Sequence, residues 1–337
     1  MLKTFVNALK IKDIRTKLLF TFLCLIIVRV GSLLPAPGIN HELIRSFFSD
    51  KANSLTFLNM LTGGSLENMA LFALGISPYI TSSIIMQLLA VAIPKLEELQ
   101  KDGETGRRKI AELSRYVTIG LAIFQSVAFG IGFANGGYLS GSNKFLSIIV
   151  LTASFTAGSA FLMWLGEQIT ENGIGNGISV ILLINIVAGL PQDYANLYTV
   201  FMQGKDIAKA AVAGLIILAI TVVLVVLIII LQDAQRKISV QYAKKMQGRN
   251  MVGGQSTYIP LKVNTAGVIP VIFAGSLMST PIIIASFFGT QPNPNGTVGQ
   301  TILAFLSQNY WFRFTDKTIP AYISLGALVY LVLLVLF

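Results

Sequence analysis

The sequence predicts an all-α, polytopic membrane protein. Of its 337 residues, 54% are hydrophobic and only 12% are charged, a composition that would leave large apolar patches in water if the protein were soluble. Several apolar runs are continuous and reach the roughly 20 residues needed to cross a hydrocarbon core of about 30 Å. Continuous runs favour helices over a membrane barrel, whose strands alternate between apolar and polar residues.

Eight hydrophobic segments can be distinguished along the chain. They lie near residues 18–34, 69–93, 117–134, 146–166, 177–190, 210–231, 264–289 and 319–337. We therefore expect a cytoplasmic amphipathic helix at 1–17, an N-terminal half at 18–192 with five spans, and part of a C-terminal half at 193–337 with three spans. The last segment stays apolar up to Phe337, so we expect the chain to be part of a longer protein.

The distribution of lysine and arginine predicts the orientation. The N-terminal stretch and the loops 94–116 and 232–263 carry 17 of these residues, against seven on the other side, and Arg29 lies inside the first span. Because cytoplasmic loops are enriched in Lys and Arg, the N-terminus and both basic loops should be cytoplasmic. The stretch 1–17 can form an amphipathic helix on the membrane surface, and a basic leader that only sets orientation is the alternative.

The second segment is interrupted by residues that are unusual in a membrane helix. GISPYITSSIIMQLL at 75–89 contains glycine, proline, hydroxyl side chains and a glutamine. We expect Pro78 to remove a backbone donor and bend the helix, while the hydroxyls that follow supply hydrogen bonds nearby. GISPYI at 75–80 and GVIPVI at 267–272 also share Gly, Pro and Ile offsets in spans of opposite direction, which is typical of inverted halves around a central pathway.

Enzyme chemistry is not predicted. The single His41 and the single Cys24 cannot assemble a zinc site or a Cys–His pair, and no Walker A loop is present. We therefore expect no catalytic site and no cofactor. No carboxylate lies in the middle of a predicted span, which argues against an ion-coupled transporter. A broken-helix secondary transporter that uses only backbone carbonyls stays open, as does a non-conducting membrane scaffold.

Branched apolar residues indicate a constriction. Ile76 and Ile80 are four residues apart and share one helix face, and Ile178 and Leu182 have the same spacing. If these faces met, together with Ile272, they would exclude water and ions by dewetting. Ordinary helix packing is the alternative for each of these residues taken alone.

The loop 232–263 is longer than a connection requires. Its stretch QDAQRKISVQYAKKMQGRN mixes apolar residues among its bases. Long loops with their own periodicity tend to be functional, so we expect a docking surface for an acidic partner, either protein or ribosomal RNA. Positive-inside bias alone is the alternative explanation.

Four long motifs closely resemble the SecY family, the central subunit of the bacterial protein-translocation channel. They are GISPYITSSIIMQLL, KDGETGRRKIAELSRY, FLMWLGEQITENGIGNGIS and QSTYIPLKVNTAGVIPVIFA, and they occur in family order. The resemblance implies a pseudo-symmetric SecY-type channel of ten spans in two halves, of which this chain would contain the first eight.

The resemblance also implies roles for particular residues. The pore ring would be Ile76, Ile80, Ile178, Leu182 and Ile272. A plug at about 54–68 would include Leu55, Phe57, Leu58, Leu61, Gly63 and Gly64, the two glycines letting it hinge away. A lateral gate would include Thr81, Gln87 and Asn264. Partner docking would involve Arg107, Arg108, Arg236, Lys237, Lys244, Lys245 and Arg249.

The function implied is a protein-conducting channel in the bacterial plasma membrane. It would move unfolded secretory polypeptides across the membrane and release hydrophobic segments sideways into the lipid bilayer. The expected partners are SecE, SecG, the SecA ATPase, the ribosome and substrates that bear signal sequences.

Overall fold

A computed structural model describes most of the chain, divided into two compact units. The described residues are 10–40, 43–44, 56–140, 143–203, 206–241, 245–247, 250–252, 256–265, 267–287, 297–306, 312–314, 321–323 and 325–336. One unit contains Met1–Pro191 and Val271–Phe337, and the other contains Gln192–Pro270. Residues 1–9 of the predicted N-terminal helix lie outside the described residues, and residues 12–17 form the first turns of the first long helix.

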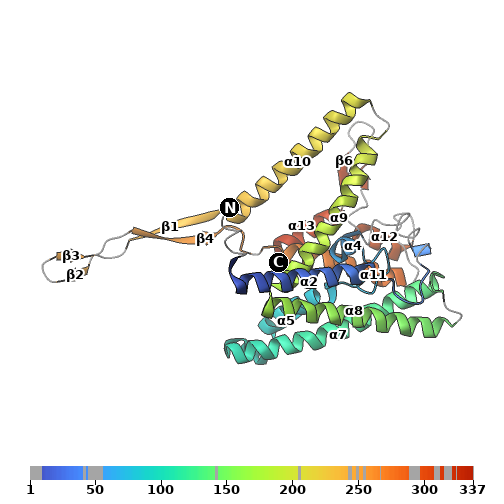
Figure 1. The fold of residues 1–337 in the computed structure, drawn as a ribbon, viewed down its shortest axis with the longest axis horizontal. Helices are drawn as coiled ribbons and strands as arrows, with labels where there is room; N and C mark the ends of the chain where they lie inside the picture. The colour runs from blue at the N-terminus through green and yellow to red at the C-terminus, as the bar shows by residue number, and fades with distance from the viewer. Residues whose placement is uncertain are drawn as a thin grey trace. The chain divides into compact units, whose positions relative to one another are not determined.

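The first unit is built mainly from helices, shown in Figure 1. They are α2 (Lys12–Leu33), α4 (Thr56–Thr62), α5 (Ser77–Ala92), α6 (Pro94–Lys101), α7 (Glu104–Asn135), α8 (Lys144–Asn172), most of α9 (Gly177–Phe201), nearly all of α11 (Ile269–Phe287), α12 (Val298–Leu306) and α13 (Leu325–Leu336). A short antiparallel pair, β5 (Phe312–Phe314) and β6 (Ala321–Ile323), lies between α12 and α13 along the chain.

Among the described residues, five helices are long and apolar enough to cross a membrane. They are α2, α7, α8, α9 and the stretch Ala210–Asp233. The protein is therefore a multi-pass helical membrane protein, as predicted. The bent pair of α5 and α6 would make a sixth span if it were counted as one. The predicted segments at 264–289 and 319–337 contain α11 and α13, which are not among these candidate spans. The full set of eight spans therefore stays a prediction.

The predicted kink at Pro78 is wrong. Residues 71–76 form turns, α5 begins at Ser77, and Pro78 occupies its first turn. Proline is favoured there because the first N–H groups of a helix have no intrahelical partner to lose. The sharp change of direction comes at Ile93 and Pro94 instead, where α5 and α6 meet at a bend of 102°.

The stretch 94–116 is mostly helical, although it was predicted to be a loop. It contains α6 and the first turns of α7, with only residues 102 and 103 between them. Gly103 has a φ of 73°, in the left-handed region that glycine adopts without steric cost, and this allows the chain to reverse.

Helices α7 and α8 lie side by side, as Figure 1 shows, and small or polar residues join them. Ser126 Oγ and Thr156 Oγ1 are 3.2 Å apart, within hydrogen-bond distance. Arg115 Nε lies 2.7 Å from Glu167 Oε1. Small residues and interhelical hydrogen bonds are the usual means of helix association in lipid, where the hydrophobic effect provides no driving force between helices.

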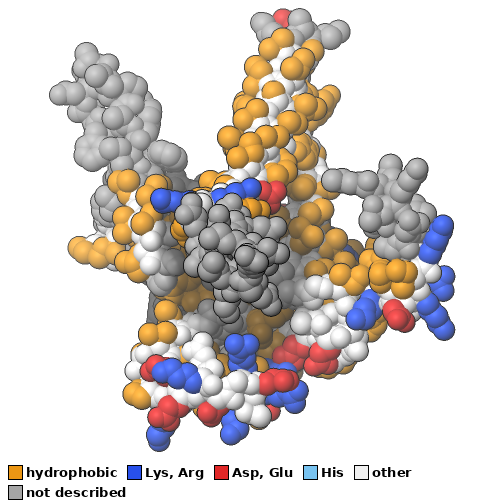
Figure 2. Space-filling model, turned by 90° about the vertical axis from the view of Figure 1, so that its left-hand side faces the viewer, with side chains coloured by type: hydrophobic (Ala, Val, Ile, Leu, Met, Phe, Trp, Pro, Cys, Tyr) orange, Lys and Arg blue, Asp and Glu red, His pale blue; other side chains and the backbone are white. Residues whose placement is uncertain are grey.

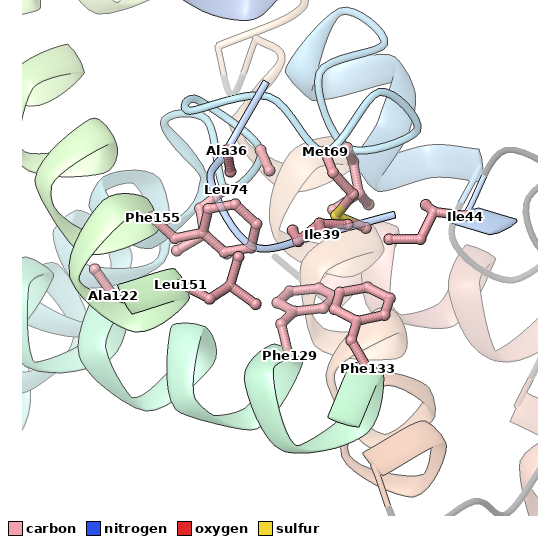
Figure 3. Close-up of a cluster of buried hydrophobic side chains, with 12 residues drawn as sticks. Ala36, Ile39, Ile44, Met69, Leu74, Ala122, Phe129, Phe133, Leu151 and Phe155 are labelled. Carbon is pink, nitrogen blue, oxygen red and sulfur yellow. The ribbon is translucent and has the colours of Figure 1, made fainter. Parts of the chain in front are cut away.

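A buried core fills the space between these helices, the irregular segments 34–40 and 63–75, and Ile44. Figure 3 shows its side chains, among which the Phe129 and Phe133 rings stack with centroids 5.8 Å apart. Phe155 and Leu151 from α8 are fully buried in the same cluster. Gly158 of α8 has no room for a side chain, because a Cβ there would collide with the carbonyl oxygen of Leu71. The turn segment before α5 is thus held directly against α8.

The second unit consists of the end of α9, the helix α10 (Ile207–Asp233) and a β-ribbon. Strands β1 (Gln235–Gln241) and β4 (Ser256–Lys262) pair antiparallel, and β2 (Lys245–Gln247) pairs with β3 (Asn250–Val252). These strands were not predicted, although Ile238 and Val240 alternate with the polar residues Lys237, Ser239 and Gln241, which is the period of a strand. The predicted all-α architecture therefore describes the membrane helices, whereas the described part of the basic loop forms two antiparallel strand pairs.

Candidate pore constriction and plug

The segment predicted to be the plug contains a short helix that ends in a well-formed glycine cap. After α4, Gly63 and Gly64 have φ values of 65° and 81°. The Gly64 N–H donates to the Asn59 carbonyl oxygen at 3.0 Å, and the Gly63 N–H donates to that of Met60 at 3.2 Å. This is the hydrogen-bond pattern of a Schellman motif, in which left-handed glycine ends the helix and satisfies its last carbonyls.

The predicted plug residues are described to different extents. Leu61 is only 6% exposed, and Gly63 and Gly64 form the cap. For Phe57 and Leu58 the structure describes only the backbone, which belongs to α4. Leu55 lies outside the described residues.

Two side chains from neighbouring helices reach the end of α4. Asn185 of α9 donates from Nδ2 to the carbonyl oxygen of Leu61 at 3.4 Å, and its side chain is only 2% exposed. Arg29 of α2 donates from Nη1 to the carbonyl oxygen of Gly63, also at 3.4 Å. The end of α4 is therefore in polar contact with two long helices.

The end of α4 also packs against the residue that precedes Ile76. Gly75 has a φ of 57°, and a Cβ there would lie only 2.9 Å from Thr62 Cγ2. Thr62 is 2% exposed. The Ile76 carbonyl oxygen accepts from the N–H groups of Tyr79 and Ile80, so Ile76 is the residue from which α5 starts. The predicted plug and the predicted pore ring thus meet at Gly75.

Three of the five predicted ring residues share one apolar cluster. Ile76 is 3% exposed within it, and Ile80 and Ile178 are partly buried against it. The other buried members come from α2, α8, α9 and the turn before α5: Cys24, Val28, Phe72, Leu162, Leu165, Ile169 and Ile181. Leu182 and Ile272 are half-buried and are not members of this cluster. A ring of all five residues stays a prediction.

The start of α9 is positioned by close contact with α8. Thr170 Oγ1 accepts a hydrogen bond of 2.9 Å from the Gly177 N–H. A Cβ on Gly166 would lie 3.1 Å from Ile178 Cγ1, so the glycine lets the isoleucine approach. This contact sets the helix face on which Ile178 and Leu182 lie.

Two of the three predicted gate residues, Thr81 and Asn264, make local hydrogen bonds. Thr81 donates from Oγ1 to the Ser77 carbonyl oxygen of its own helix at 3.0 Å. Gln87 is exposed. Asn264 accepts at Oδ1 from the Gly267 N–H at 3.1 Å, which closes a turn before α11. Pairing of these groups across a seam stays a prediction.

The predicted docking residues lie on two separate elements where they are described. Arg107 and Arg108 are exposed on the first turns of α7, and Arg108 pairs with Glu104 at 2.8 Å. Arg236 and Lys237 are exposed on β1, and the Lys237 Nζ lies 4.8 Å from the centroid of the Tyr258 ring. Of the rest, Lys245 is described only by its backbone in β2, whereas Lys244 and Arg249 lie outside the described residues.

The charged side chains are not spread evenly over the surface. Figure 2 shows Lys and Arg mixed with Asp and Glu at the lower edge of one face, while other helices expose mainly hydrophobic side chains. Within the described part of the chain, no group of His, Cys, Asp and Glu could hold a metal ion.

Asn185 was not among the residues singled out from the sequence. It lies in GISVILLINIVAGLP, where it is a polar residue inside an otherwise apolar segment. Polar side chains inside membrane spans are costly and usually have a partner, so the position itself was a usable signal. Its partner could not be named, because it is a main-chain carbonyl far away in the sequence.

Comparisons with known proteins agree on one family. A family model described as SecY matches residues 70–337. The protein translocase subunit SecY of Halalkalibacterium halodurans is 47% identical over 296 residues, covering 86% of this chain and 68% of that protein. The SecY subunit of Bacillus licheniformis is 44% identical over 335 residues, covering 94% of this chain and 77% of that protein.

Solved structures share the fold. One is described as "The structure of a protein conducting channel", with a TM-score of 0.60, 18% identity and coverage of 96% of this chain and 70% of that one. Another, with a TM-score of 0.57, 18% identity and coverage of 95% and 69%, concerns the plug domain of SecY and the closed state of the channel. The idle yeast Ssh1 complex bound to the 80S ribosome has a TM-score of 0.63, 15% identity and coverage of 96% and 71%.

Proposed function

Because this chain belongs to the SecY family, it is a subunit of a protein-conducting translocation channel and not an enzyme, and we propose which of its residues form the pore, plug and gate. Ile76, Ile80, Ile178, Leu182 and Ile272 form the constriction. The segment 54–68 is the plug, and Thr81, Gln87 and Asn264 line the lateral gate. Family membership removes the alternatives of a secondary transporter and of a non-conducting scaffold.

The contact between Thr62 and Gly75 is the main observation that supports this proposal. It brings the end of the plug helix against the residue next to Ile76. A plug at that position blocks the passage on one side of an apolar ring. The ring itself excludes water and ions, because an apolar constriction dewets and does not replace the hydration shell of an ion.

The transported chain is held without sequence recognition. Flexible apolar side chains contact any polypeptide weakly, so an unfolded chain can pass. A sufficiently hydrophobic segment partitions into lipid through the lateral gate, at a favourable free energy for each apolar residue. Polar gate residues hold the seam with hydrogen bonds of about 1 kcal/mol each, which an entering signal helix can displace.

The driving force comes from partners. The ribosome and SecA dock on basic residues, of which Arg107 and Arg108 on α7 and Arg236 and Lys237 on β1 are exposed. The others are Lys244, Lys245 and Arg249 of the sequence 232–263. Exposed cations favour association with acidic surfaces and with RNA phosphates. The ribosome-bound Ssh1 complex has the same fold, which supports this partner. SecE and SecG complete the channel in the bacterial plasma membrane, with the N-terminus in the cytoplasm.

Site-specific crosslinking during translocation tests the ring. A photoreactive residue is placed at each ring position of the chain, assembled with its partners and loaded with a stalled secretory precursor. We expect crosslinks to the precursor from Ile76, Ile80, Ile178, Leu182 and Ile272. Leu183 is the matched control, because it neighbours Leu182 but is 62% exposed and lies outside the proposed ring. Equal yields from ring and control positions in a translocating complex would overturn the assignment.

A further inference from the structure

We infer that Arg29 and Asn185 form a latch that holds the plug in its closed position, through hydrogen bonds to the main-chain carbonyl oxygens of Gly63 and Leu61. This inference rests on the proposed plug. It assigns a positioning role to two residues outside the pore ring, the gate and the plug itself.

The carbonyl oxygens at the end of α4 can be accounted for one by one. Those of Asn59 and Met60 accept from the glycine N–H groups of the cap, and that of Thr62 accepts from the Ser65 hydroxyl at 2.8 Å. These bonds lie within the plug and would move with it. The carbonyls of Leu61 and Gly63 instead accept from side chains of α9 and α2. Of these five carbonyls, the two that accept from α9 and α2 would lose their hydrogen bonds if the plug moved away from those helices.

Asn185 is oriented toward the plug. A carbonyl oxygen can only accept, so the amide must turn its nitrogen toward Leu61. Its Oδ1 atom is buried and has no partner among the described residues. A buried asparagine that served only to join the helices would be expected to use both ends of its amide. Its one hydrogen bond in the described structure goes to the plug.

Arg29 carries a charge in the first span without a carboxylate partner in the described structure. The ion pairs found there join Lys101 with Glu97, Arg108 with Glu104 and Arg115 with Glu167. A cation near the carbonyl end of a helix is favourable, because the peptide dipoles leave partial negative charge there. The plug therefore offers Arg29 an electrostatic partner that is lost when the plug leaves.

The two bonds suit a plug that must also open. Both are 3.4 Å long, beyond the usual range for N–H···O bonds, so each is weak. Once the plug has moved, both side chains can be hydrated in the opened passage. If the plug stays in place after a donor side chain of the latch has been replaced, the carbonyl oxygen that accepted from it is buried without a hydrogen bond. This is unfavourable for the closed position. Removing the donors should therefore favour the open position.

Cysteine labelling of the plug tests the latch. Ser65 is fully buried, so Ser65→Cys reports plug opening when it reacts with a membrane-impermeant maleimide. The background carries Cys24→Ala, which removes the only native thiol. When the plug recloses faster than the thiol reacts, the labelling rate follows the population of the open position.

We expect Asn185→Leu and Arg29→Met each to raise the labelling rate about fivefold, which corresponds to about 1 kcal/mol. Asn196→Leu is the matched control, because Asn196 is an exposed asparagine on the same helix. Arg29→Lys, which keeps the charge, should give an intermediate rate. If Asn185→Leu fails to fold, Asn185→Ser, which keeps a shorter donor, replaces it and should raise the rate less.

The outcomes separate the latch from the channel assignment. Rates in both latch variants equal to that of Asn196→Leu would overturn the latch, while crosslinks from the ring positions would still support the pore. Loss of the ring crosslinks with elevated labelling in the latch variants would overturn the pore assignment and leave the contact between plug and helices standing.

Discussion

The hydroxyl of Ser82 on α5 donates a hydrogen bond of 2.7 Å to the main-chain carbonyl oxygen of Ser114 on α7. Both serines are buried, and Thr118 donates to the same oxygen at 2.6 Å. Helix α5 carries Ile80 and Thr81, so this bond fixes the helix of the proposed pore and gate to the stable pair of α7 and α8. In an apolar setting such a bond is one of the few directional contacts between helices.

We expect Ser82→Ala to loosen this attachment. The loss of one buried interhelical bond should lower the free energy of unfolding by about 1 kcal/mol. Thermal unfolding of the purified chain in detergent measures the change. Ser83→Ala is the matched control, because Ser83 is the next residue and is only half-buried. An equal shift in both variants would show that the bond to Ser114 contributes nothing specific.

Gly75→Ala should displace the plug. The backbone is in the left-handed region, where a Cβ costs about 1–2 kcal/mol, and the new methyl group would also press on Thr62. We expect faster maleimide labelling of Ser65→Cys and a raised ion conductance of the idle channel. Gly120→Ala is the control, because Gly120 has open space around it and an ordinary helical backbone. A closed, unlabelled plug in Gly75→Ala would contradict the proposed contact.

Ile76→Asn should make the idle channel leak ions. The substitution buries an amide in an apolar cluster, which costs about 1–3 kcal/mol if the amide stays unpaired and is relieved if water enters. Conductance of membranes that contain the variant measures the leak. Leu183→Asn places the same amide at a position that is 62% exposed and should leave the conductance low. An unchanged conductance in Ile76→Asn would remove Ile76 from the seal.

Lys101→Gln should raise the pKa of Glu97. Lys101 donates a hydrogen bond of 2.6 Å to the Glu97 carboxylate, and this bond, aided by the lysine charge, holds the pKa of that carboxyl below its usual value. A depressed pKa means that the pair stabilises α6 above the unfolded-state pKa and that this contribution disappears as the pH falls through the folded-state pKa. NMR titration of the carboxyl measures the shift. Lys95→Gln is the control, and an equal response to both substitutions would contradict the pairing.

Much of the fold could be predicted because the amino-acid composition of a segment reflects whether lipid or water surrounds it. Helices α2, α7, α8, α9 and α10 all lie over predicted segments, since any run long enough to cross lipid must satisfy its own backbone hydrogen bonds. The starting point of α5 was harder. Pro78 is compatible with a kink and with a first turn alike, and only the packing of residues 71–76 against α8 selects the first turn.

The β-ribbon formed by strands β1 to β4 shows a different limit to prediction from the sequence. Its alternation is short, and positive-inside bias explains its lysines and arginines equally well, so the pattern favoured a loop. The pairing of Ile238 with Ile259 and of Ser239 with Tyr258 depends on two strands finding each other across an intervening segment. A single strand does not contain that information.

The sequence by itself determined the class of protein, the positions of the long apolar helices and the family, because hydrophobic length and extended motifs are properties of contiguous residues. Tertiary structure alone decided that Thr62 lies against Gly75, and that Arg29 and Asn185 reach the carbonyls at the end of α4. Main-chain oxygens are chemically the same at every residue. The packing of the helices therefore decides which main-chain oxygen a distant side chain contacts, and the amino-acid types along the sequence do not.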